Sequence, residues 1–441
     1  MRTDAHFIDV PEKPRVNTQA GTSRLAVMNF LNEVAGDFPH AISLASGRPA
    51  EDFFDLDRWL EAIPLYQREL ATRWGVTRAD AGRRLAQYGR TNGLINELVA
   101  AQLKQDEGVQ TRGEHIVIGA GCQEALALCL LSLCREKNDV VLARDPTYIG
   151  MTGVADLHGI EIVPLYAHDD GLADELRTVT ERLGREGKRA RALYLIPEFD
   201  NPTGAVLSLR VRKELLDVCA DQRMLVLEDN PYGLFRYEGE RVPTMYALDH
   251  TGSVIYLFTY SKTLCPAVRI GGAVVPDTLF GDAIAARALV AELGERKSFL
   301  TVNTSQLNQA LIGGILLSEN GTLNRLVSPQ RDHYRKNRDL MLSALSDEFA
   351  GNDEGIRWNR PEGGFFLTMD LPFRFGQEEV LQCARERHVI PMPLSFFSLS
   401  GICQKSIRLA FSNVASTHIA EGVARLGQFI RQCEEACHAA V

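Results

Sequence analysis

Residues 254–275 read VIYLFTYSKTLCPAVRIGGAVV and contain two β-rich runs, 254–258 and 269–275. Short runs of this kind alternate with helical patterns through the middle of the chain. Other strand-like runs span 116–120, 140–143, 160–165, 192–197 and 224–229, and helical patterns begin at 122 and span 208–222. This alternation predicts an α/β fold with a mostly parallel sheet, helices on both faces, and ligands at the carboxyl ends of the strands.

Lys262 lies just past the first run of this stretch. It follows Ser261 and precedes Thr263, and Arg269 comes seven residues later. A lysine amine can form an imine with an aldehyde and can then carry protons. Arg269, Ser261 and Thr259 together could bind a phosphate. For the Ser-Lys pair alone a surface lysine is the simpler interpretation, but the whole segment disfavours it.

Polar residues follow two other strand-like runs. Asp229 lies 33 residues before Lys262, with Tyr232 three residues further on. An aspartate here could pair with a protonated pyridine nitrogen and keep the ring an electron sink, while Tyr232 could donate to a phenolic oxygen of that ring. Asn201, in the turn signal Asn-Pro-Thr-Gly, could contact the same oxygen and a substrate carboxylate. A helix cap or turn remains the alternative for Asp229, and a simple turn for Asn201.

Three further features suit a bound anion or aromatic ring. Gly119 and Gly121 allow a tight turn into a helix whose first N–H groups could bind phosphate. Tyr148 could stack on a ring, with a core tyrosine as the alternative. Arg408 alternates with the apolar residues of its strand. Its guanidinium could clamp an α-carboxylate, and a surface arginine would give the same pattern.

The remaining sequence predicts a second, smaller α+β domain. A long helical region precedes two more strand-like runs, and the N-terminal part contains a helix-like piece, a loop, a helical stretch and a Gly-rich turn. The long helical region spans 279–348, and the two strand-like runs span 365–371 and 406–412. In the N-terminal part, the helix-like piece lies at 23–34, the loop at 41–56, the helical stretch runs up to about 84, and the Gly-rich turn lies at 87–93. We expect segment 1–60 to join the small domain, 61–320 to form the large domain carrying Lys262, and 321–441 to form the small domain.

Composition narrows the class of protein. The 441 residues are 45% hydrophobic and 24% charged, as in globular proteins, and the net charge of −9 argues against nucleic-acid binding. Nine cysteines lack the spacing of a metal site or a disulfide framework, so we expect reduced thiols and no metal. Because no stretch resembles a signal peptide or a membrane span, we expect a cytoplasmic protein without a membrane partner.

The order and spacing of these motifs resemble one known family. GlyCysGln, ProThrTyr, AsnProThrGly, AspXxxXxxTyr, SerLys and ArgLeuAlaPheSer resemble the class I/II aminotransferases, pyridoxal 5'-phosphate (PLP) enzymes of fold type I. ISLASGRP at 42–49 and QYGRTNG at 87–93 are similar to the branch with 2-aminoadipate and kynurenine aminotransferases and MocR-like regulators. The resemblance covers about residues 20–430.

The resemblance implies a role for each residue of these motifs. Lys262 would hold PLP as an internal aldimine and later act as the base at the substrate Cα. Asp229 would pair with the pyridine nitrogen, and Tyr148 would stack on the ring. Asn201 and Tyr232 would contact the phenolic oxygen. The phosphate would be surrounded by Cys122, Gln123, Thr259, Ser261 and Arg269.

The resemblance also implies a homodimer with composite active sites. Tyr88 would reach the phosphate of the neighbouring subunit's cofactor. Arg408 would hold the substrate α-carboxylate, and Gly47 would lie against the substrate. Arg24 and Arg48 could sit near the pocket mouth and favour an acidic substrate side chain, with solvated arginines as the simpler interpretation.

Three positions depart from the usual pattern of the family. Cys122 stands where serine or another small residue is common, and because a thiol is a weak donor its backbone N–H would serve the phosphate better. Asp200 stands where glutamine, histidine or serine is frequent, and Arg48 where many relatives carry an apolar residue.

The implied reaction is a ping-pong exchange that moves an amino group from an L-amino acid to a 2-oxo acid. Other fold type I chemistry at Cα, Cβ or Cγ stays open: elimination, replacement, decarboxylation or oxidation. A non-catalytic PLP-binding sensor is a further alternative, although only about forty residues precede Ile42, too few for a winged helix and linker. Candidate donors run from glutamate, 2-aminoadipate and aromatic or branched amino acids to an unusual amino acid of a specialised biosynthetic pathway.

Overall fold

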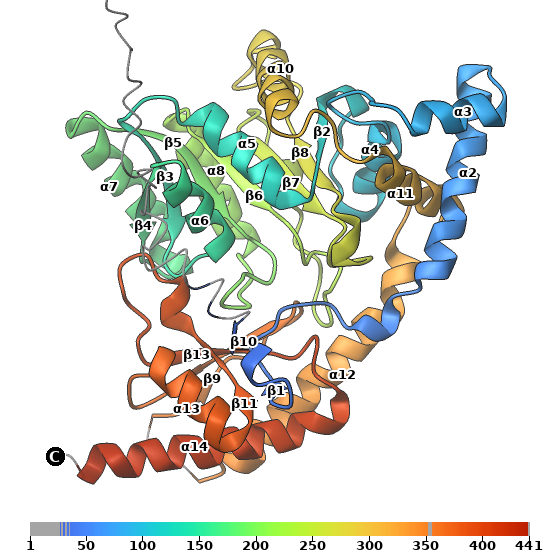
Figure 1. Cartoon of the computed structure of the whole chain (residues 1–441). Coiled ribbons are helices and arrows are strands. Elements are labelled where there is room, and N and C mark those ends of the chain that lie inside the picture. Colours follow the sequence, from blue (N-terminus) through green and yellow to red (C-terminus); the bar gives the residue numbers. More distant parts are fainter. Residues whose placement is uncertain (1–26, 28–29, 31–32, 35, 352–354, 440–441) are drawn as a thin grey trace, which may run out of the picture.

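A seven-stranded sheet forms the centre of the protein (Figure 1). The computed structural model describes residues 27, 30, 33–34, 36–351 and 355–439. In spatial order the strands are β2 (Ile116–Gly119), β8 (Gly271–Val274), β7 (Val254–Thr259), β6 (Leu225–Asp229), β5 (Arg189–Leu195), β3 (Asp139–Arg144) and β4 (Glu161–Leu165). Only β8 runs antiparallel to its neighbours, so the predicted, mostly parallel sheet is confirmed.

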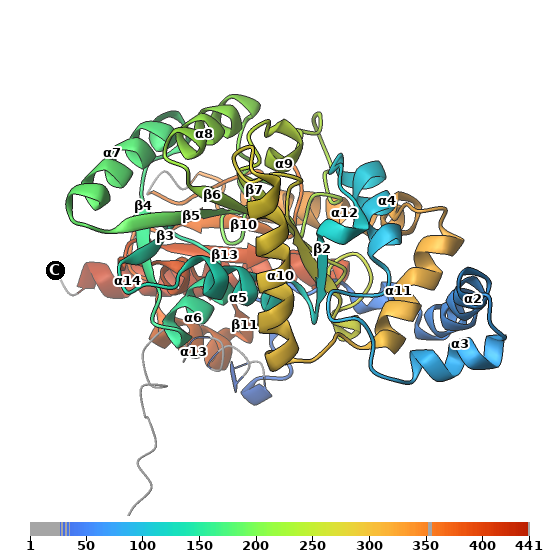
Figure 2. The same ribbon diagram turned by 90° about the horizontal axis from the view of Figure 1, so that it is seen from above.

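Helices cover both faces of this sheet, as the view from above shows (Figure 2). One face is covered by α7 (Leu172–Arg185) and α8 (Leu209–Asp221), and the other by α5 (Cys122–Leu133) and α6 (Ile149–Leu157). Alternate residues of β3 divide between them: Val140 and Leu142 pack on the α7 and α8 side, Val141 and Ala143 on the other. Because both faces are buried, the strands read in sequence as continuous apolar runs.

The other helices near this sheet include two that the sequence did not predict. They are α2 (Leu56–Trp74), α3 (Arg78–Leu85), α4 (Asn96–Glu107), α9 (Met245–Leu248), α10 (Ala283–Leu300) and α11 (Gln306–Ser318). The predicted helical stretch up to about residue 84 is two helices, because Gly75 ends α2 with a φ of 61°. The two unpredicted helices are the four-residue α9 and α4. Helix α4 buries the polar residues Gln102, Asp106 and Glu107, which hides its apolar period.

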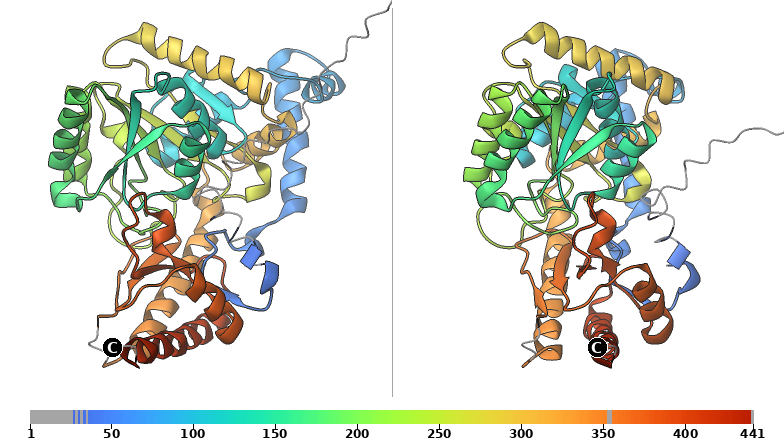
Figure 3. Two further views of the ribbon diagram at one scale, coloured as in Figure 1. Left: turned by 60° about the vertical axis from the view of Figure 1, so that its left-hand side comes forward. Right: turned by 90° about the vertical axis from the view of Figure 1, so that its left-hand side faces the viewer.

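A second, smaller group of elements lies against the carboxyl ends of the central strands. It contains an antiparallel sheet in the order β12 (Met392–Pro393), β13 (Ser406–Ala410), β10 (Phe366–Asp370) and β9 (Arg357–Trp358), with helices α13 (Gln377–Arg387) and α14 (Ile419–Ala439). The long helix α12 (Asn324–Glu348) runs from the large part into the small part (Figure 3). Its residue Tyr334 belongs to the core of the large part, and Met341 to the core of the small part.

The N-terminal region contributes a strand to the small part. β1 (Ile42–Ser43) pairs in parallel with β11 (Val389–Ile390). The predicted helix at 23–34 falls mostly outside the described residues, and the predicted domain boundaries stay a prediction. No helix within the described ranges is long and apolar enough to cross a bilayer.

Loops after the central strands join the two parts. The Thr147 N–H, just after β3, donates to the Phe397 carbonyl oxygen at 2.9 Å. Asn359 of the small part donates to the Thr203 carbonyl oxygen, in the loop after β5, at 2.7 Å. The carboxyl ends of the strands therefore face the small part across a narrow boundary, where the predicted site residues gather.

Candidate active site

Two adjoining cavities lie at this boundary. The first, of about 240 Å³, is lined by all the cofactor residues predicted within one subunit: Cys122, Gln123, Tyr148, Asn201, Asp229, Tyr232, Thr259, Ser261, Lys262 and Arg269. The second, of about 360 Å³, is lined by Gly47 and Arg408 and shares Arg48, Asn201, Tyr232 and Lys262 with the first. Tyr88 lines neither cavity and is 78% exposed, and Arg24 lies outside the described residues.

Lys262 occupies the wall between the two cavities. Its Nζ donates to the Gly47 carbonyl oxygen at 3.0 Å. Burial, together with the positive charges of Arg408, Arg48 and Arg269, lowers its pKa to about 8, against the opposing effect of Asp229. An amine with such a pKa is partly neutral near physiological pH and can act as a nucleophile.

Asp229 closes β6 and is 4% exposed. The Tyr194 hydroxyl donates to its Oδ2 at 2.8 Å, and the Cys122 thiol donates to its Oδ1 at 3.4 Å. Burial raises the pKa of Asp229 to about 6, although these two hydrogen bonds and the charge of Lys262 favour the ionised form. Its carboxylate therefore points into the site, and the Cys122 thiol contacts this carboxylate.

The opposite end of the first cavity gathers donors suited to a phosphate. Arg269 donates to the Ser261 hydroxyl at 3.3 Å and to the Ala120 carbonyl oxygen at 3.1 Å. Gly121 precedes α5 with a φ of 86°, and a Cβ there would lie 2.5 Å from an Arg269 nitrogen. Glycine is therefore required at this turn, which leaves the first N–H groups of α5 open toward an anion.

Two tyrosines line the middle of the first cavity. The Tyr148 hydroxyl donates to Gln123 Oε1 at 3.4 Å, and Gln123 Nε2 donates to the Gly150 carbonyl oxygen at 2.7 Å. Tyr232 packs edge-on against Phe366 with ring centroids 5.7 Å apart. Burial raises the pKa of both phenols, so both remain protonated donors.

Arg408 is a buried cation in the second cavity and is 4% exposed, so it is not a surface arginine. Its Nη1 donates to Asn201 Oδ1 at 2.7 Å and its Nη2 to the Ala45 carbonyl oxygen at 2.6 Å. Its guanidinium carbon lies 4.1 Å from the ring centroid of Phe366 and 4.7 Å from that of Phe397. Its buried Nε has no hydrogen-bond partner among the described residues, which suits an anionic ligand.

Several residues of the site had no signal in the sequence. Phe366 and Phe397 flank Arg408 from β10 and the loop after β12, far from any motif. A Cβ on Gly47 would lie 2.3 Å from the Phe366 ring, which explains why glycine stands there. Tyr194 could have been found, because it follows the alternation of β5 and lies beside the strand that ends at Asp229.

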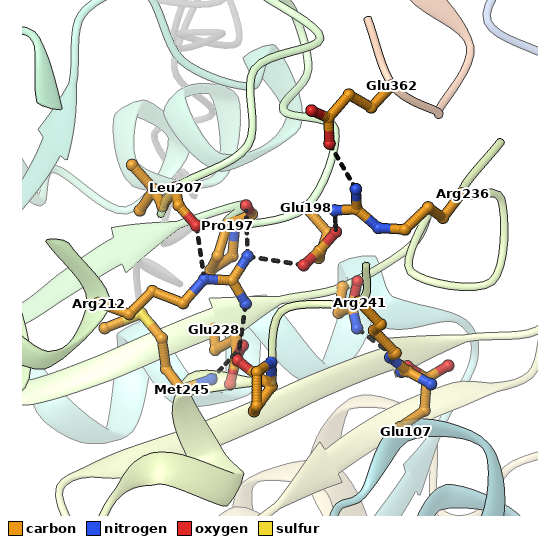
Figure 4. A network of polar contacts seen from close by, with 12 residues as sticks. Glu107, Pro197, Glu198, Leu207, Arg212, Glu228, Arg236, Arg241, Met245 and Glu362 are labelled. Atoms are coloured by element: carbon orange, nitrogen blue, oxygen red, sulfur yellow. Dashed lines mark hydrogen bonds and ion pairs between the residues drawn. The ribbon is translucent and has the colours of Figure 1, made fainter. Parts of the chain in front are cut away.

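A network of buried charges supports the loop that carries Asn201 (Figure 4). Glu198 accepts from Arg212 Nη2 at 2.7 Å and from Arg236 Nη2 at 2.9 Å, and Arg236 continues to Glu362 of the small part at 2.5 Å. Arg212 is fully buried and also donates to three backbone carbonyl oxygens, those of Pro197, Leu207 and Pro243. Arg212 thus fixes both ends of the loop after β5.

Replacing Arg212 should destabilise the whole protein. In Arg212→Met, three carbonyl oxygens lose the hydrogen-bond donor that the buried guanidinium provides. Glu198 loses the donor Arg212 and keeps only Arg236 among the described residues. We expect the free energy of unfolding, measured by urea denaturation, to fall by about 3–5 kcal/mol. Arg210→Met, on the same helix but exposed and paired only at the surface, should change it by less than about 1 kcal/mol. Equal effects of the two variants would contradict this account.

The residues of the first cavity fit PLP. A lysine amine suits its aldehyde, a buried carboxylate suits its ring nitrogen, and Arg269 with Ser261 and the α5 N-terminus suits its phosphate. The Gly121 turn, which a Cβ would fill, leaves the room that such a phosphate needs.

The family profile described as "Aminotransferase class I and II" matches residues 39–426. The chain belongs to this family. This aminotransferase is 37% identical over 407 residues to a (S)-3,5-dihydroxyphenylglycine transaminase of Amycolatopsis orientalis, covering 92% of this chain and 91% of the relative. It is 31% identical over 399 residues to a 2-aminoadipate transaminase of Thermus thermophilus, covering 89% and 91%.

A solved structure has the same fold. The kynurenine aminotransferase of Pyrococcus horikoshii, in complex with PMP, superposes with a TM-score of 0.78 at 27% identity over 92% of this chain and 94% of that one. The predicted family, fold type I architecture, PLP cofactor and aminotransferase activity are therefore confirmed. The aminotransferase moves an amino group between an amino acid and a 2-oxo acid.

Proposed function

We propose that this aminotransferase takes its amino group from L-amino acids with an aromatic side chain. The observation that carries the proposal is a group of apolar and aromatic side chains that line the second cavity beside the polar residues Ser43, Ser46, Arg48 and Asn413. The group consists of Ile149, Phe366, Ile390, Met392 and Phe397. Such a wall favours a flat apolar ring over a charged chain. The 37% identical relative named for (S)-3,5-dihydroxyphenylglycine supports an aryl substrate of a specialised pathway.

The substrate α-carboxylate would bind at Arg408. Its guanidinium already has a fixed orientation, because Asn201 and the Ala45 carbonyl oxygen hold two of its nitrogens. Its unpaired Nε remains available for the carboxylate, and the surrounding rings exclude water from the pair. Gly47 would leave room for the substrate backbone.

Around the cofactor, each predicted residue keeps its proposed role. When bound, PLP supplies a protonated ring that accepts the electron pair released at the substrate Cα. Lys262 Nζ would accept the proton from the substrate Cα and hold it for its return. Asp229 holds the proton of the ring nitrogen, Asn201 and Tyr232 donate to the phenolic oxygen, and Tyr148 stacks on the ring. Gln123, Thr259, Ser261, Arg269 and the Cys122 backbone N–H bind the phosphate.

The pKa of Lys262 predicts the pH dependence of cofactor capture. Only the neutral amine attacks an aldehyde, and at pH 7 about 10% of an amine with pKa 8 is neutral, against well under 1% of an ordinary lysine. When PLP is added to the stripped enzyme, the rate of covalent attachment should rise about tenfold per pH unit up to about pH 8 and then level off. Stopped-flow absorbance measures this rate, and a plateau only above pH 10 would contradict the prediction.

A substrate panel tests the proposed donor class. Single half-reactions, followed as the loss of the holoenzyme absorbance, should run fastest with aryl amino acids such as phenylglycine, 3,5-dihydroxyphenylglycine and phenylalanine. We expect glutamate and 2-aminoadipate to be at least about tenfold slower, because their side-chain carboxylate would enter the apolar wall. Faster reaction of the acidic amino acids would instead assign Arg48 to the substrate side chain.

We also propose a homodimer in which Tyr88 completes the neighbouring site. Tyr88 lies beside a group of exposed apolar residues at the junction of α10 and α11, and Gln306 of α11 donates to the Gln87 carbonyl oxygen next to it. The group consists of Phe299, Leu300, Val302 and Leu307, of which Phe299 is 92% exposed. An exposed apolar patch of this kind is typical of a subunit interface.

Hybrid dimers test the composite site. A Tyr88→Ala subunit and a Lys262→Ala subunit each lack one contribution, but a mixed dimer holds one site with both residues intact. After mixing and exchange of subunits, about one quarter of wild-type activity should return, since half of the dimers are mixed and each has one intact site. No gain over the separate variants, or a monomer in light scattering, would contradict the proposal.

A further inference from the structure

Tyr194 lies on β5 just below the active site and has no role in the assignments above. Its Cα pairs with Leu227 of β6 on one side and with Ala143 of β3 on the other. Because side chains alternate along a strand, Leu227 and Asp229 point to the same face of the sheet. Tyr194 lies beside Leu227, two residues before Asp229. Its side chain is long enough to cover this distance along the strand, and its hydroxyl donates to Asp229 Oδ2 at 2.8 Å.

The Tyr194 hydroxyl can only be a donor to this carboxylate. The side chain is 1% exposed, and Asp229 is its hydrogen-bond partner within the described residues. Burial and the neighbouring Asp229 charge raise the pKa of Tyr194 well above its ordinary value. The phenol therefore keeps its proton, and one oxygen of Asp229 is permanently hydrogen-bonded from inside the protein.

The second oxygen of Asp229 is held much more weakly. Cys122 Sγ donates to Oδ1 over 3.4 Å, and a thiol is a poor donor. Burial and the same carboxylate raise the pKa of Cys122, so it too stays protonated. A ring N–H that approaches Oδ1 displaces only this weak bond, whereas displacing a hydroxyl would cost more. The two donors thus leave one oxygen fixed and one oxygen available.

We propose that Tyr194 is a positioning residue that keeps Asp229 ionised and aims its free oxygen at the ring nitrogen of PLP, with Cys122 as a second, displaceable donor. The inference rests on the proposed pairing of Asp229 with that nitrogen. The physical reason is burial: a carboxylate with little solvent depends on donors from the protein to stay charged. Without the Tyr194 hydroxyl, Oδ2 has no donor among the described residues, and a protonated, neutral Asp229 forms no ion pair with the ring N–H.

Two cofactors separate this role from simple packing. PLP has the ring nitrogen, and 1-deazapyridoxal phosphate has a C–H in its place but the same shape, aldehyde and phosphate. We compare the dissociation constants of both for the full-length stripped enzyme, by absorbance titration. Tyr194→Phe should bind PLP about 10- to 100-fold more weakly than the wild type, as expected for a lost hydrogen bond to a charged group. Both proteins should bind the deaza compound equally, within about twofold.

Tyr260→Phe is the matched control. Tyr260 is also buried and also loses one hydroxyl bond, to Gln102 Oε1 at 3.1 Å, but it lines neither active-site cavity. Its affinity for both cofactors should match the wild type. Cys122→Ala should bind PLP as tightly as the wild type or slightly more tightly, within about threefold, because the ring N–H displaces this weak donor from Oδ1.

The outcomes distinguish the inference from the proposed function. A loss in Tyr194→Phe that is equal for both cofactors, or no loss for either, overturns the positioning role. Asp229→Asn tests the underlying pairing: it should weaken binding of PLP and leave the deaza compound unaffected. If Asp229→Asn binds both cofactors like the wild type, the proposed pairing itself is wrong, whatever Tyr194→Phe does.

Discussion

Lys262→Ala should abolish turnover and the covalent link to the cofactor together. The variant loses the amine that attaches PLP and the base that moves the substrate proton. A positioned general base alone is worth about 10²–10⁴ in rate, so we expect a loss of at least about 10³-fold in kcat. The phosphate and ring contacts remain, so PLP should still bind, but reversibly.

Borohydride reduction and peptide mapping check this prediction directly. In the wild type the reduced label should be found on the peptide that contains Lys262. Lys297 is a stringent internal control, because it is also fully buried and its pKa is also lowered by burial, yet it lines neither active-site cavity. Lys188→Ala, which removes a half-exposed lysine paired with Glu161, should keep both label and activity. A label on Lys297, or none on any lysine, would contradict the assignment.

The central sheet could be predicted because burial on both faces leaves a simple signal. Strands such as β7, which is buried along nearly its whole length, read as short apolar runs separated by helical patterns. The helix α4 could not be predicted in this way. Its buried face contains Gln102, Asp106 and Glu107, whose partners come from segments far along the chain, such as Thr322 and Arg241. Polar partners at that separation leave no local periodicity.

The gathering of the cofactor residues also follows from sequence order. Parallel strands end at one edge of a sheet, so motifs that follow successive strands meet there without further information. Asp229, Asn201 and Lys262 could therefore be predicted to lie close together, and all three line the first cavity. The direction in which a side chain points could not be predicted in this way. The Cys122 thiol contacts Asp229, and its direction depends on the backbone turn at Gly121.

Contacts between the two parts of the protein were the hardest feature to predict from the sequence. Phe366 lies in the predicted strand-like run 365–371, but neither it nor Phe397 belongs to a motif that pointed to Arg408, which the two rings flank. They determine what Arg408 can bind, because they desolvate its charge and exclude water from any ion pair formed there. The carboxylate role of Arg408 was one of two interpretations of its strand, beside a surface arginine, and the strength of the proposed clamp depends on these two rings.

Arg408→Ala should weaken the use of every α-amino acid while leaving the cofactor in place. A carboxylate held by charge-assisted bonds in a desolvated pocket is worth about 3–5 kcal/mol, so kcat/KM should fall by about 10²–10⁴-fold. Arg408→Lys keeps a charge but loses the two-pronged donor and should recover only part of this loss. Both variants should still bind PLP, seen as retained holoenzyme absorbance, because Arg408 does not line the first cavity.

An amine without a carboxylate makes this test specific. Phenylalanine and 2-phenylethylamine share the ring and the amino group, and only the first carries the anion that Arg408 would bind. In half-reactions the wild type should prefer phenylalanine by a large factor, whereas Arg408→Ala should react with the two at rates within about tenfold of each other. Since the loss then tracks the carboxylate alone, a general distortion of the pocket is separated from loss of the clamp. An equal slowing of both compounds would remove Arg408 from the substrate site.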